Sequence, residues 1–203
     1  MSLPYIYSIK FCSDKGERKS VKKISVFYLA GARRLRRGRE EETMNFAEVE
    51  RDYIRSRILP DFEWVVNAQP SRINPLRKPV RESRVALVAT GGVHLAADRP
   101  FRLLDKKGDW SWREIPGDVA YDRLRLSHVG YNTGKVSGDI NCVFPLERLR
   151  ELAREGVIGS VSPRHFSFMG YIPITEPLVT GTAPEVAQKL REDQVDLVLL
   201  APA

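Results

Sequence analysis

The stretch that decides the fold is Arg84-Val-Ala-Leu-Val-Ala-Thr90, which is closed by Gly91-Gly92. A short, continuous apolar run that is rich in Val and bounded by glycines is typical of a strand buried on both faces. Such strands belong to parallel sheets that are covered by helices on each side. This stretch therefore predicts the central strand of an α/β domain.

The residues that follow alternate between strand and helix patterns. Trp110 to Ile115 alternates large and polar side chains, and Leu124 to His128 is a second short strand candidate. An apolar stripe predicts a helix over 145–155, with Gly156 placed to end it and a strand over 157–161. A helix followed by a strand is the rhythm of an α/β fold.

The last helix and strand continue this pattern. Thr182-Ala-Pro-Glu185 fits a capping box, in which Thr182 and Glu185 each satisfy a free backbone donor at the start of a helix. Asp193 ends this helix, and an apolar strand over 195–200 runs directly to Ala203. Open α/β sheets place reactive groups in the loops after strand carboxyl ends. We therefore expect an open, mostly parallel, Rossmann-like sheet that is incomplete at its C-terminus, with a terminal edge strand as the alternative.

The chain divides into three parts by composition. Residues 84–203 are the expected α/β domain, and residues 44–83 lead into it as a helix followed by a proline-containing connector. Residues 1–43 carry eleven Lys and Arg against five Asp and Glu, whereas the rest of the chain carries 22 against 21. The first part is thus a basic extension, which we expect either to be disordered or to precede a true start at Met44.

Two interpretations explain the basic run Arg-Arg-Leu-Arg-Arg-Gly-Arg-Glu-Glu-Glu at 33–42. It could be an arm that binds nucleic acid or an anionic membrane, since clustered arginines displace counterions from phosphates. Arg, Gly and Glu can also all be encoded by purine-only triplets, so a translated ribosome-binding site upstream of Met44 explains the same run. We favour the second interpretation and do not expect nucleic acid as a partner.

Composition favours one cytoplasmic globular domain. With 203 residues and 42% hydrophobic content the chain can bury one sizeable core. It contains no apolar run long enough to cross a membrane and no secretory signal, so we expect a cytoplasmic location and no membrane partner. Cys12 and Cys142 lie far apart and form no metal-binding spacing, which argues against a disulfide framework and a metal site.

Two histidines are the candidate catalytic residues. His128 ends a predicted strand, where an imidazole could shuttle protons near neutral pH. His165 stands beside Arg164, whose guanidinium suits a carboxylate substrate. Each histidine has a structural alternative, as a core or loop-capping side chain, and the residues themselves leave both alternatives open.

The candidate substrate-binding residues are Gly91, Gly92, Asp139, Asn141 and Arg164. The two glycines could open a phosphate-binding turn, although neither the dinucleotide-binding motif nor the P-loop motif is present. For Asp139 and Asn141 the alternative role is turn formation, because both residue types bond their own backbone.

Five strings of the chain are informative as exact sequences. They are Arg84-Val-Ala-Leu-Val-Ala-Thr-Gly-Gly-Val-His-Leu95, Trp112-Arg-Glu-Ile-Pro116, Gly138-Asp-Ile-Asn-Cys-Val-Phe-Pro-Leu-Glu-Arg-Leu149, Gly156-Val-Ile-Gly-Ser160 and Arg164-His-Phe-Ser-Phe-Met-Gly170. Together they resemble the selenoprotein B family of glycine, sarcosine, betaine and D-proline reductases, over a range from about Pro75 to Ala203. The likeness is strongest to the branch near the selenoprotein subunit of D-proline reductase.

This resemblance implies an oxidoreductase of amino-acid fermentation. Such enzymes cleave a carbon–nitrogen bond reductively with a selenolate or thiolate nucleophile and a dithiol/disulfide couple. In the family, the strand equivalent to 195–200 is followed by selenocysteine or cysteine, two further residues and a second cysteine. The resemblance thus implies selenocysteine immediately after Ala203, and a chain truncated there because its UGA codon is normally taken as a stop. Without that pair we expect the 203-residue product to be inactive.

The resemblance also implies partners. A pyruvoyl group would lie on a separate reductase subunit, a thioredoxin-like dithiol would donate electrons, and the substrate would be a small amine or amino acid. No cofactor is expected in this chain itself. The alternative is a non-catalytic ligand-binding or assembly module of the same fold without the redox pair, in which Gly91-Gly92, Asp139 and Arg164 line a crevice.

Overall fold

The computed structural model describes residues 5–8, 45–57, 60–63 and 74–203. The chain divides into two compact units, one formed by residues 27–72 and the other by residues 1–26 together with 73–203. In the first unit, helix α1 (Phe46–Arg57) has Glu48 in its first turn and arginines in its last, which suits the helix dipole. This confirms the helix expected before Pro60.

The second unit contains a six-stranded, mostly parallel sheet. Its order is β1-β8-β2-β7-β4, and β6 pairs with β2 beside β7. Only β4 runs antiparallel, along β7. A separate two-stranded antiparallel sheet is formed by β3 and β5. The bounds are β1 (Tyr5–Ser8), β2 (Arg84–Ala89), β3 (Val93–Leu95), β4 (Trp112–Pro116), β5 (Leu124–Leu126), β6 (Ser160–Val161), β7 (Arg164–Phe168) and β8 (Leu197–Ala201).

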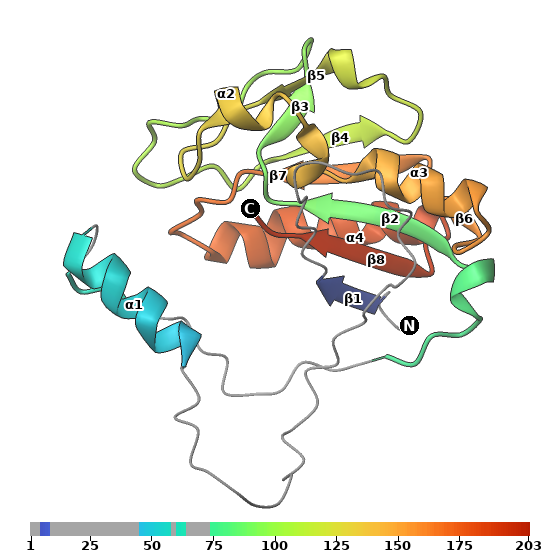
Figure 1. Ribbon diagram of the computed structural model, residues 1–203, viewed down its shortest axis with the longest axis horizontal. Helices are drawn as coiled ribbons and strands as arrows, with labels where there is room; N and C mark the ends of the chain where they lie inside the picture. The colour runs from blue at the N-terminus through green and yellow to red at the C-terminus, as the bar shows by residue number, and fades with distance from the viewer. Residues whose placement is uncertain (1–4, 9–44, 58–59, 64–73) are drawn as a thin grey trace, which may run out of the picture. The chain divides into compact units, whose positions relative to one another are not determined.

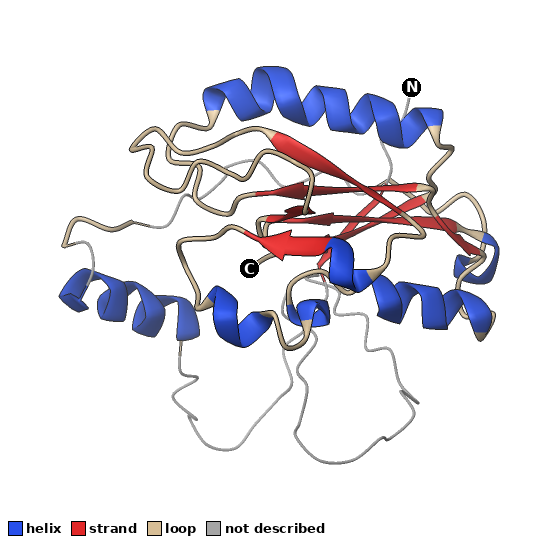
Figure 2. Cartoon of the chain, turned by 90° about the horizontal axis from the view of Figure 1, so that it is seen from above, coloured by secondary structure: helices blue, strands red, loops and turns tan. Residues whose placement is uncertain are grey.

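Strand β2 lies at the centre of the sheet and is buried on both faces, as its Val-rich sequence predicts. Val85, Leu87 and Ala89 belong to an apolar cluster that includes side chains of helix α3 (Leu146–Arg154). Ala86 belongs to a second cluster that includes side chains of helix α4 (Ala183–Glu192). Helices therefore cover both faces of the sheet (Figure 2).

Helix α3 ends where the sequence predicts. Gly156 adopts a left-handed conformation with φ of 70°, which a glycine tolerates without strain. Its N–H donates to the Ala153 carbonyl at 3.2 Å, and Val157 N–H donates to the Leu152 carbonyl at 2.9 Å. This is a Schellman motif, and it satisfies carbonyls that the end of the helix leaves free.

The capping box expected at the start of α4 is wrong. The Thr182 hydroxyl donates to the Trp110 carbonyl at 2.8 Å, and the Glu185 carboxylate accepts from Trp112 Nε1 at 3.2 Å. Thr182 itself has helical backbone angles, because a π-helical turn, η4 (Leu178–Thr182), leads directly into α4. Both side chains are thus used for contacts with the segment around β4.

The strand expected over 157–161 is shorter than predicted, and β7 was missed altogether. Pro163 has no N–H, and it stands between β6 and β7. The two strands pair with the same side of β2, one with its start and the other with its end. At the gap, Leu87 N–H donates to His165 Nδ1 at 2.9 Å. An imidazole therefore takes the place of a backbone acceptor inside the sheet.

Short helical segments complete the described part of the chain. They are η1 (Val80–Glu82), η2 (Tyr121–Arg123), α2 (Thr133–Val136) and η3 (Ile140–Cys142). Among the described residues, no helix is both long enough and apolar enough to span a membrane.

Three predictions on organisation remain open in part. Of the basic extension at 1–43, residues 5–8 form β1, and its other residues lie outside the described ranges. Of the proline-containing connector expected over 67–83, residues 67–73 also lie outside them, whereas 74–83 are described and include η1. The mostly parallel α/β sheet is confirmed, while its Rossmann-like character and its incompleteness at the C-terminus stay predictions.

Candidate functional site

The carboxyl ends of the parallel strands β2, β7 and β8 meet at one edge of the sheet. The arrowheads of β2 and β8 point toward this edge, where the end of the chain lies (Figure 1). Thr90 follows β2, Gly170 lies just after β7, and Ala203 lies just after β8. We refer to Thr90, Gly91, Gly170, Ala203 and the loop residues beside them as the carboxyl edge.

Thr90 holds the end of β8 in place. Its N–H donates to the Ala201 carbonyl at 3.1 Å, which continues the β2–β8 ladder beyond β2. Its hydroxyl then accepts from Ala203 N–H at 3.0 Å. The backbone that leaves β8 is therefore bound by a threonine side chain, although it no longer belongs to the strand.

Gly92 brings the loop after β5 to this edge. Its N–H donates to the Phe168 carbonyl at 2.8 Å, and its own carbonyl accepts from Ser127 N–H at 2.9 Å. Its φ is 65°, and a Cβ added there would lie 2.0 Å from the Ser127 carbonyl oxygen. No residue other than glycine fits, and this close approach places His128 against the carboxyl edge.

His128 has one satisfied and one free ring nitrogen. Nδ1 accepts from Gly130 N–H at 2.9 Å, and the ring stacks on Tyr131 with 4.4 Å between centroids. The Tyr131 hydroxyl donates to the Gly91 carbonyl, and burial raises the pKa of this phenol to about 12. Nε2 is buried and has no hydrogen-bond partner.

Burial lowers the pKa of His128, because it disfavours the charged imidazolium. Since Nδ1 accepts a hydrogen bond, the neutral ring carries its proton on Nε2. The free group is therefore an N–H donor. Such a donor can stabilise an anion at this edge through a charge-assisted hydrogen bond.

The atoms around Gly170 show where the free Nε2 of His128 lies. A Cβ added to Gly170 would lie 2.7 Å from His128 Nε2 and 3.1 Å from each of the Ala203 and Thr90 carbonyl oxygens. The imidazole and the ends of β2 and β8 thus converge on one glycine. The structure brings Gly91, Gly92 and His128 together at the carboxyl edge, while the crevice expected from Gly91, Gly92, Asp139 and Arg164 stays a prediction.

His165 lies elsewhere, in the interior of the sheet. It is fully buried, its Nδ1 accepts from Leu87 N–H, and its ring meets Phe144 edge-on at 6.4 Å between centroids. Burial, together with the positive charge of Arg150, lowers its pKa to about 3. The arrangement is that of a neutral structural histidine, and the supporting catalytic role predicted for it stays a prediction.

Arg164 lies at the amino end of β7, away from the carboxyl edge. Its guanidinium forms a bidentate pair with Asp193, at 2.9 Å from Nε and 2.8 Å from Nη2, and this pair raises its pKa further. A second contact joins it to Glu114 at 3.7 Å. Its substrate-binding role stays a prediction, since the carboxylates of Asp193 and Glu114 already neutralise its charge.

Asp139 and Asn141 form a turn just before α3. One Asp139 carboxylate oxygen accepts from the Asn141 N–H and from its side-chain amide, both at 3.0 Å. The Asn141 oxygen accepts from the Tyr121 hydroxyl at 2.8 Å. This is the turn chemistry that both residue types favour, and the structure does not bring them to His128.

Three residues of the carboxyl edge were missed in the sequence: Thr90, Tyr131 and Gly170. The position of Thr90, directly after the central strand, could have identified it. The other two could not be found this way, because a stacking partner and a close glycine approach appear only when distant segments meet.

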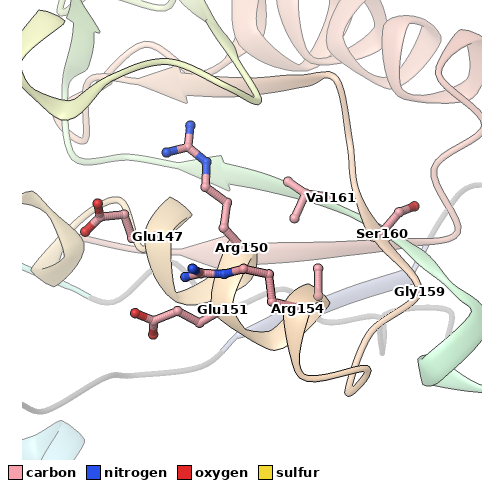
Figure 3. Close-up of a pocket in the computed structure, with 8 residues that line it drawn as sticks. Glu147, Arg150, Glu151, Arg154, Gly159, Ser160 and Val161 are labelled. Carbon is pink, nitrogen blue, oxygen red and sulfur yellow. The ribbon is translucent and has the colours of Figure 1, made fainter. Parts of the chain in front are cut away.

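A shallow groove of about 700 Å³ lies apart from the carboxyl edge, between α3 and β6. Glu147, Arg150, Glu151 and Arg154 line it from the helix, and residues 159–161 line it from the strand (Figure 3). Arg150 already donates to the Gly117 and Val119 carbonyls. Within the described ranges, no group of three or more His, Cys, Asp or Glu side chains could hold a metal ion.

A helix-covered, mostly parallel sheet with a histidine donor at its carboxyl edge defines an α/β protein whose site lies at the strand ends. The chain belongs to the glycine/sarcosine/betaine reductase selenoprotein B family, whose model matches residues 49–203. This confirms the resemblance seen in the five strings.

Three relatives illustrate the match. The D-proline reductase subunit gamma of Acetoanaerobium sticklandii is 43% identical over 68% of this chain and 55% of its own length. The betaine reductase complex component B subunit beta of Peptoclostridium acidaminophilum is 29% identical over 61% of this chain and 28% of its own length. The glycine reductase complex component B subunit gamma of Symbiobacterium thermophilum is 28% identical over 63% of this chain and 30% of its own length. The chain thus spans about half of the first relative and under a third of the others, and no solved structure matches it.

Proposed function

We propose that this chain is part of the redox subunit of an amino-acid reductase, which cleaves a carbon–nitrogen bond of a small amine or amino acid. Family membership supports the class of activity, and 43% identity to a D-proline reductase subunit makes D-proline the first substrate to test. The observation that carries the proposal is the free His128 Nε2–H, which lies against Gly170 at the carboxyl edge, where the Ala203 carbonyl also approaches that glycine.

The redox group of this proposal is selenocysteine or cysteine directly after Ala203, with a second cysteine three positions further on. The surroundings fit such a group, because Thr90 holds Ala203 N–H and a buried N–H donor faces the same backbone. A selenolate or thiolate there would supply the nucleophile, and the second cysteine would resolve the adduct. Breaking the carbon–nitrogen bond takes two electrons and two protons, which a dithiol supplies as it becomes a disulfide.

Residues of this chain would position the redox group and stabilise its anionic form. His128 Nε2–H would donate a hydrogen bond to the anionic form of the group after Ala203, which would lower the pKa of that group. Tyr131 would keep the imidazole ring in place by stacking, and its hydroxyl is tied to the Gly91 carbonyl. Thr90 would fix the direction in which the backbone leaves β8.

The same proposal includes partners. A separate subunit would carry a pyruvoyl group that activates the substrate amine, and a thioredoxin-like dithiol would regenerate the redox pair. A cytoplasmic location suits this chemistry, because thiols stay reduced there. The relatives named as subunits or components of reductases support a complex of several chains.

The first experiment reads the gene beyond the codon of Ala203 and labels the native protein with selenium. We expect a UGA codon or a cysteine codon there, then two further codons and a cysteine codon. An in-frame stop other than UGA, with no cysteine pair downstream, would remove the redox proposal and favour a non-catalytic binding module.

The second experiment replaces His128 in the full-length protein. We expect His128→Ala to lower dithiol-dependent cleavage of D-proline by about a hundredfold or more, because one preorganised hydrogen-bond donor to an anion contributes that much. The control is His94→Gln, since His94 bonds only Ser127 and Leu95 and does not face Ala203. Equal rates for the His128 variant and the wild type, with the redox pair present, would exclude this role.

A further inference from the structure

The turn 128–131 closes around the imidazole that it carries. Gly130 N–H donates to His128 Nδ1 at 2.9 Å, only two positions away along the chain. The ring of Tyr131 then stacks on the same imidazole, with an angle of 19° between the two ring planes. One nitrogen and one face of His128 are therefore held by the two residues that end its own turn.

Gly130 lies against the edge of the imidazole because it has no side chain. A Cβ added there would lie 2.8 Å from His128 Cε1 and 3.3 Å from Nδ1. Among the described residues, it would meet no other heavy atom within 4 Å apart from those of its chain neighbours. The φ of Gly130 lies outside the left-handed region, so the backbone itself does not require glycine there. Only the imidazole excludes a side chain at this position.

A second glycine lies at the opposite side of the ring, but it has other neighbours as well. A Cβ added to Gly170 would lie 2.7 Å from His128 Nε2, and also 3.1 Å from the carbonyl oxygens of Thr90 and Ala203. A substitution at Gly170 would therefore disturb the backbone at two strand ends. At Gly130 a small side chain would act on the imidazole alone, which makes this position the more informative one.

The hydrogen bond from Gly130 selects one form of the ring. Nδ1 accepts it only while that nitrogen carries no proton, so the proton of the neutral ring stays on Nε2. Protonation would turn Nδ1 into a donor that faces another donor, so the same bond favours the neutral ring. Burial lowers the pKa of His128 in the same direction.

We propose that Gly130 is a positioning residue, whose N–H and lack of a side chain together fix the orientation and the Nε2–H tautomer of His128. It acts only through the imidazole. A donor that is already in place costs no reorganisation when an anion forms beside it. The catalytic importance of Gly130 rests on the proposed function, whereas the fixed tautomer does not.

The tautomer can be tested in the 203-residue chain by nitrogen NMR of its imidazoles at about pH 8, where a histidine is ordinarily neutral. Protonated and unprotonated ring nitrogens differ widely in chemical shift. The chain has three histidines, and the spectrum of His128→Ala identifies the signals of His128. We expect the Nε2–H form alone in the wild type. Gly130→Ala should give a mixture with the Nδ1–H form, because the displaced ring loses its bond to the backbone.

Two variants serve as controls. Gly138→Ala makes the same change where a Cβ would lie 3.5 Å from the Lys135 carbonyl oxygen, which is an ordinary contact. Tyr131→Phe removes the phenol hydroxyl and keeps the stacked ring. Both should leave the tautomer of His128 unchanged. The urea midpoint of Gly130→Ala should stay close to that of the wild type, because the end of a side chain gives way and the backbone does not.

The catalytic consequence is tested in the full-length protein with its redox pair. Gly130→Ala should lower kcat for D-proline cleavage by about tenfold to a hundredfold, since a displacement of about 1 Å in a catalytic group costs that much. KM should change little, because the donor acts on the anion of the redox group. Gly138→Ala should keep the wild-type kcat.

The other outcomes contradict the proposal at separate steps. An Nδ1–H form in the wild type, or an Nε2–H form that persists unchanged in Gly130→Ala, would overturn it. An equal change of tautomer in Tyr131→Phe would assign the effect to the phenol, and an unfolded Gly130→Ala chain would show that more than the ring gives way. If the wild type showed no reductase activity, the proposed function would fail, and the NMR comparison would still decide for or against Gly130.

Discussion

At His165 a side chain accepts a hydrogen bond that a neighbouring strand would normally accept with its backbone carbonyl. Its Nδ1 accepts from Leu87 N–H where Pro163 interrupts the strand, so the ring must stay unprotonated at that nitrogen. Its pKa falls from 6.5 to about 3 on folding, chiefly through burial. A protonated imidazole would place an N–H against an N–H.

This difference makes stability depend on pH. The unfolded chain binds a proton at His165 below about pH 6.5 and the folded chain does not, so the stabilisation is complete above that pH. The free energy of unfolding should fall as the pH drops from 6.5 toward 3. His165→Asn keeps an acceptor near the Nδ1 position without titrating, so its urea midpoint should fall less steeply between about pH 7 and pH 4. An equal change of the urea midpoint with pH in the wild type and in His165→Asn would contradict the assignment of this pH dependence to His165.

Gly92 and Gly156 differ in what a side chain would cost there: at Gly156 it would cost backbone strain, and at Gly92 it would also cost a steric clash. Both have positive φ, but a Cβ on Gly156 meets nothing within 4 Å, whereas one on Gly92 meets the Ser127 carbonyl oxygen at 2.0 Å. Gly156→Ala should therefore cost about 1 kcal/mol from backbone strain alone. Gly92→Ala should cost distinctly more, because the loop that carries His128 must move. Urea unfolding of both variants checks this, and equal losses would show that the close approach is not needed.

At the scale of elements, the start of α4 shows a motif overruled by its neighbours. Thr182 and Glu185 have the spacing of a capping box, yet Thr182 bonds the Trp110 carbonyl and Glu185 bonds the Trp112 indole. The preceding π-helical turn already supplies helical backbone before Thr182, so no free N-cap position exists there.

A double-mutant cycle distinguishes the two arrangements. Thr182→Val should cost about 1 kcal/mol for the lost hydrogen bond, and Glu185→Ala a similar or smaller amount. Because the two side chains bond different groups, their effects on the free energy of unfolding should add within about 0.5 kcal/mol. A larger coupling energy would indicate that the capping box forms in solution.

At the scale of the whole molecule, two apolar clusters on opposite faces of the sheet hold the second unit together. Sequence patterns predicted β2, β4, β5, α3, α4 and β8, because each carries its own apolar periodicity or end signal. They missed β7, since its inward residues His165 and Ser167 are polar. His165 Nδ1 accepts from Leu87 N–H and the Ser167 hydroxyl accepts from Val93 N–H, 78 and 74 positions away, while His165 Nε2 has no hydrogen-bond partner.

The sequence predicted only part of the candidate site. Gly91, Gly92 and His128 do come together, because each follows a strand whose end is readable in the sequence. Arg164, Asp139 and Asn141 have partners that no pattern reveals, such as Asp193 and Tyr121.

The sequence by itself therefore determined the family, the central strand and the helix end at Gly156, since these depend on residues that are neighbours along the chain. Only the tertiary structure decided which histidine lies at the carboxyl edge. His128 and His165 look alike in sequence and each keeps a buried Nε2 without a hydrogen-bond partner, but one ring lies against Gly170 at the carboxyl edge and the other is enclosed in the sheet. The reason is physical: the role of an imidazole depends on its burial and its hydrogen-bond partners, and for both rings those come from distant segments.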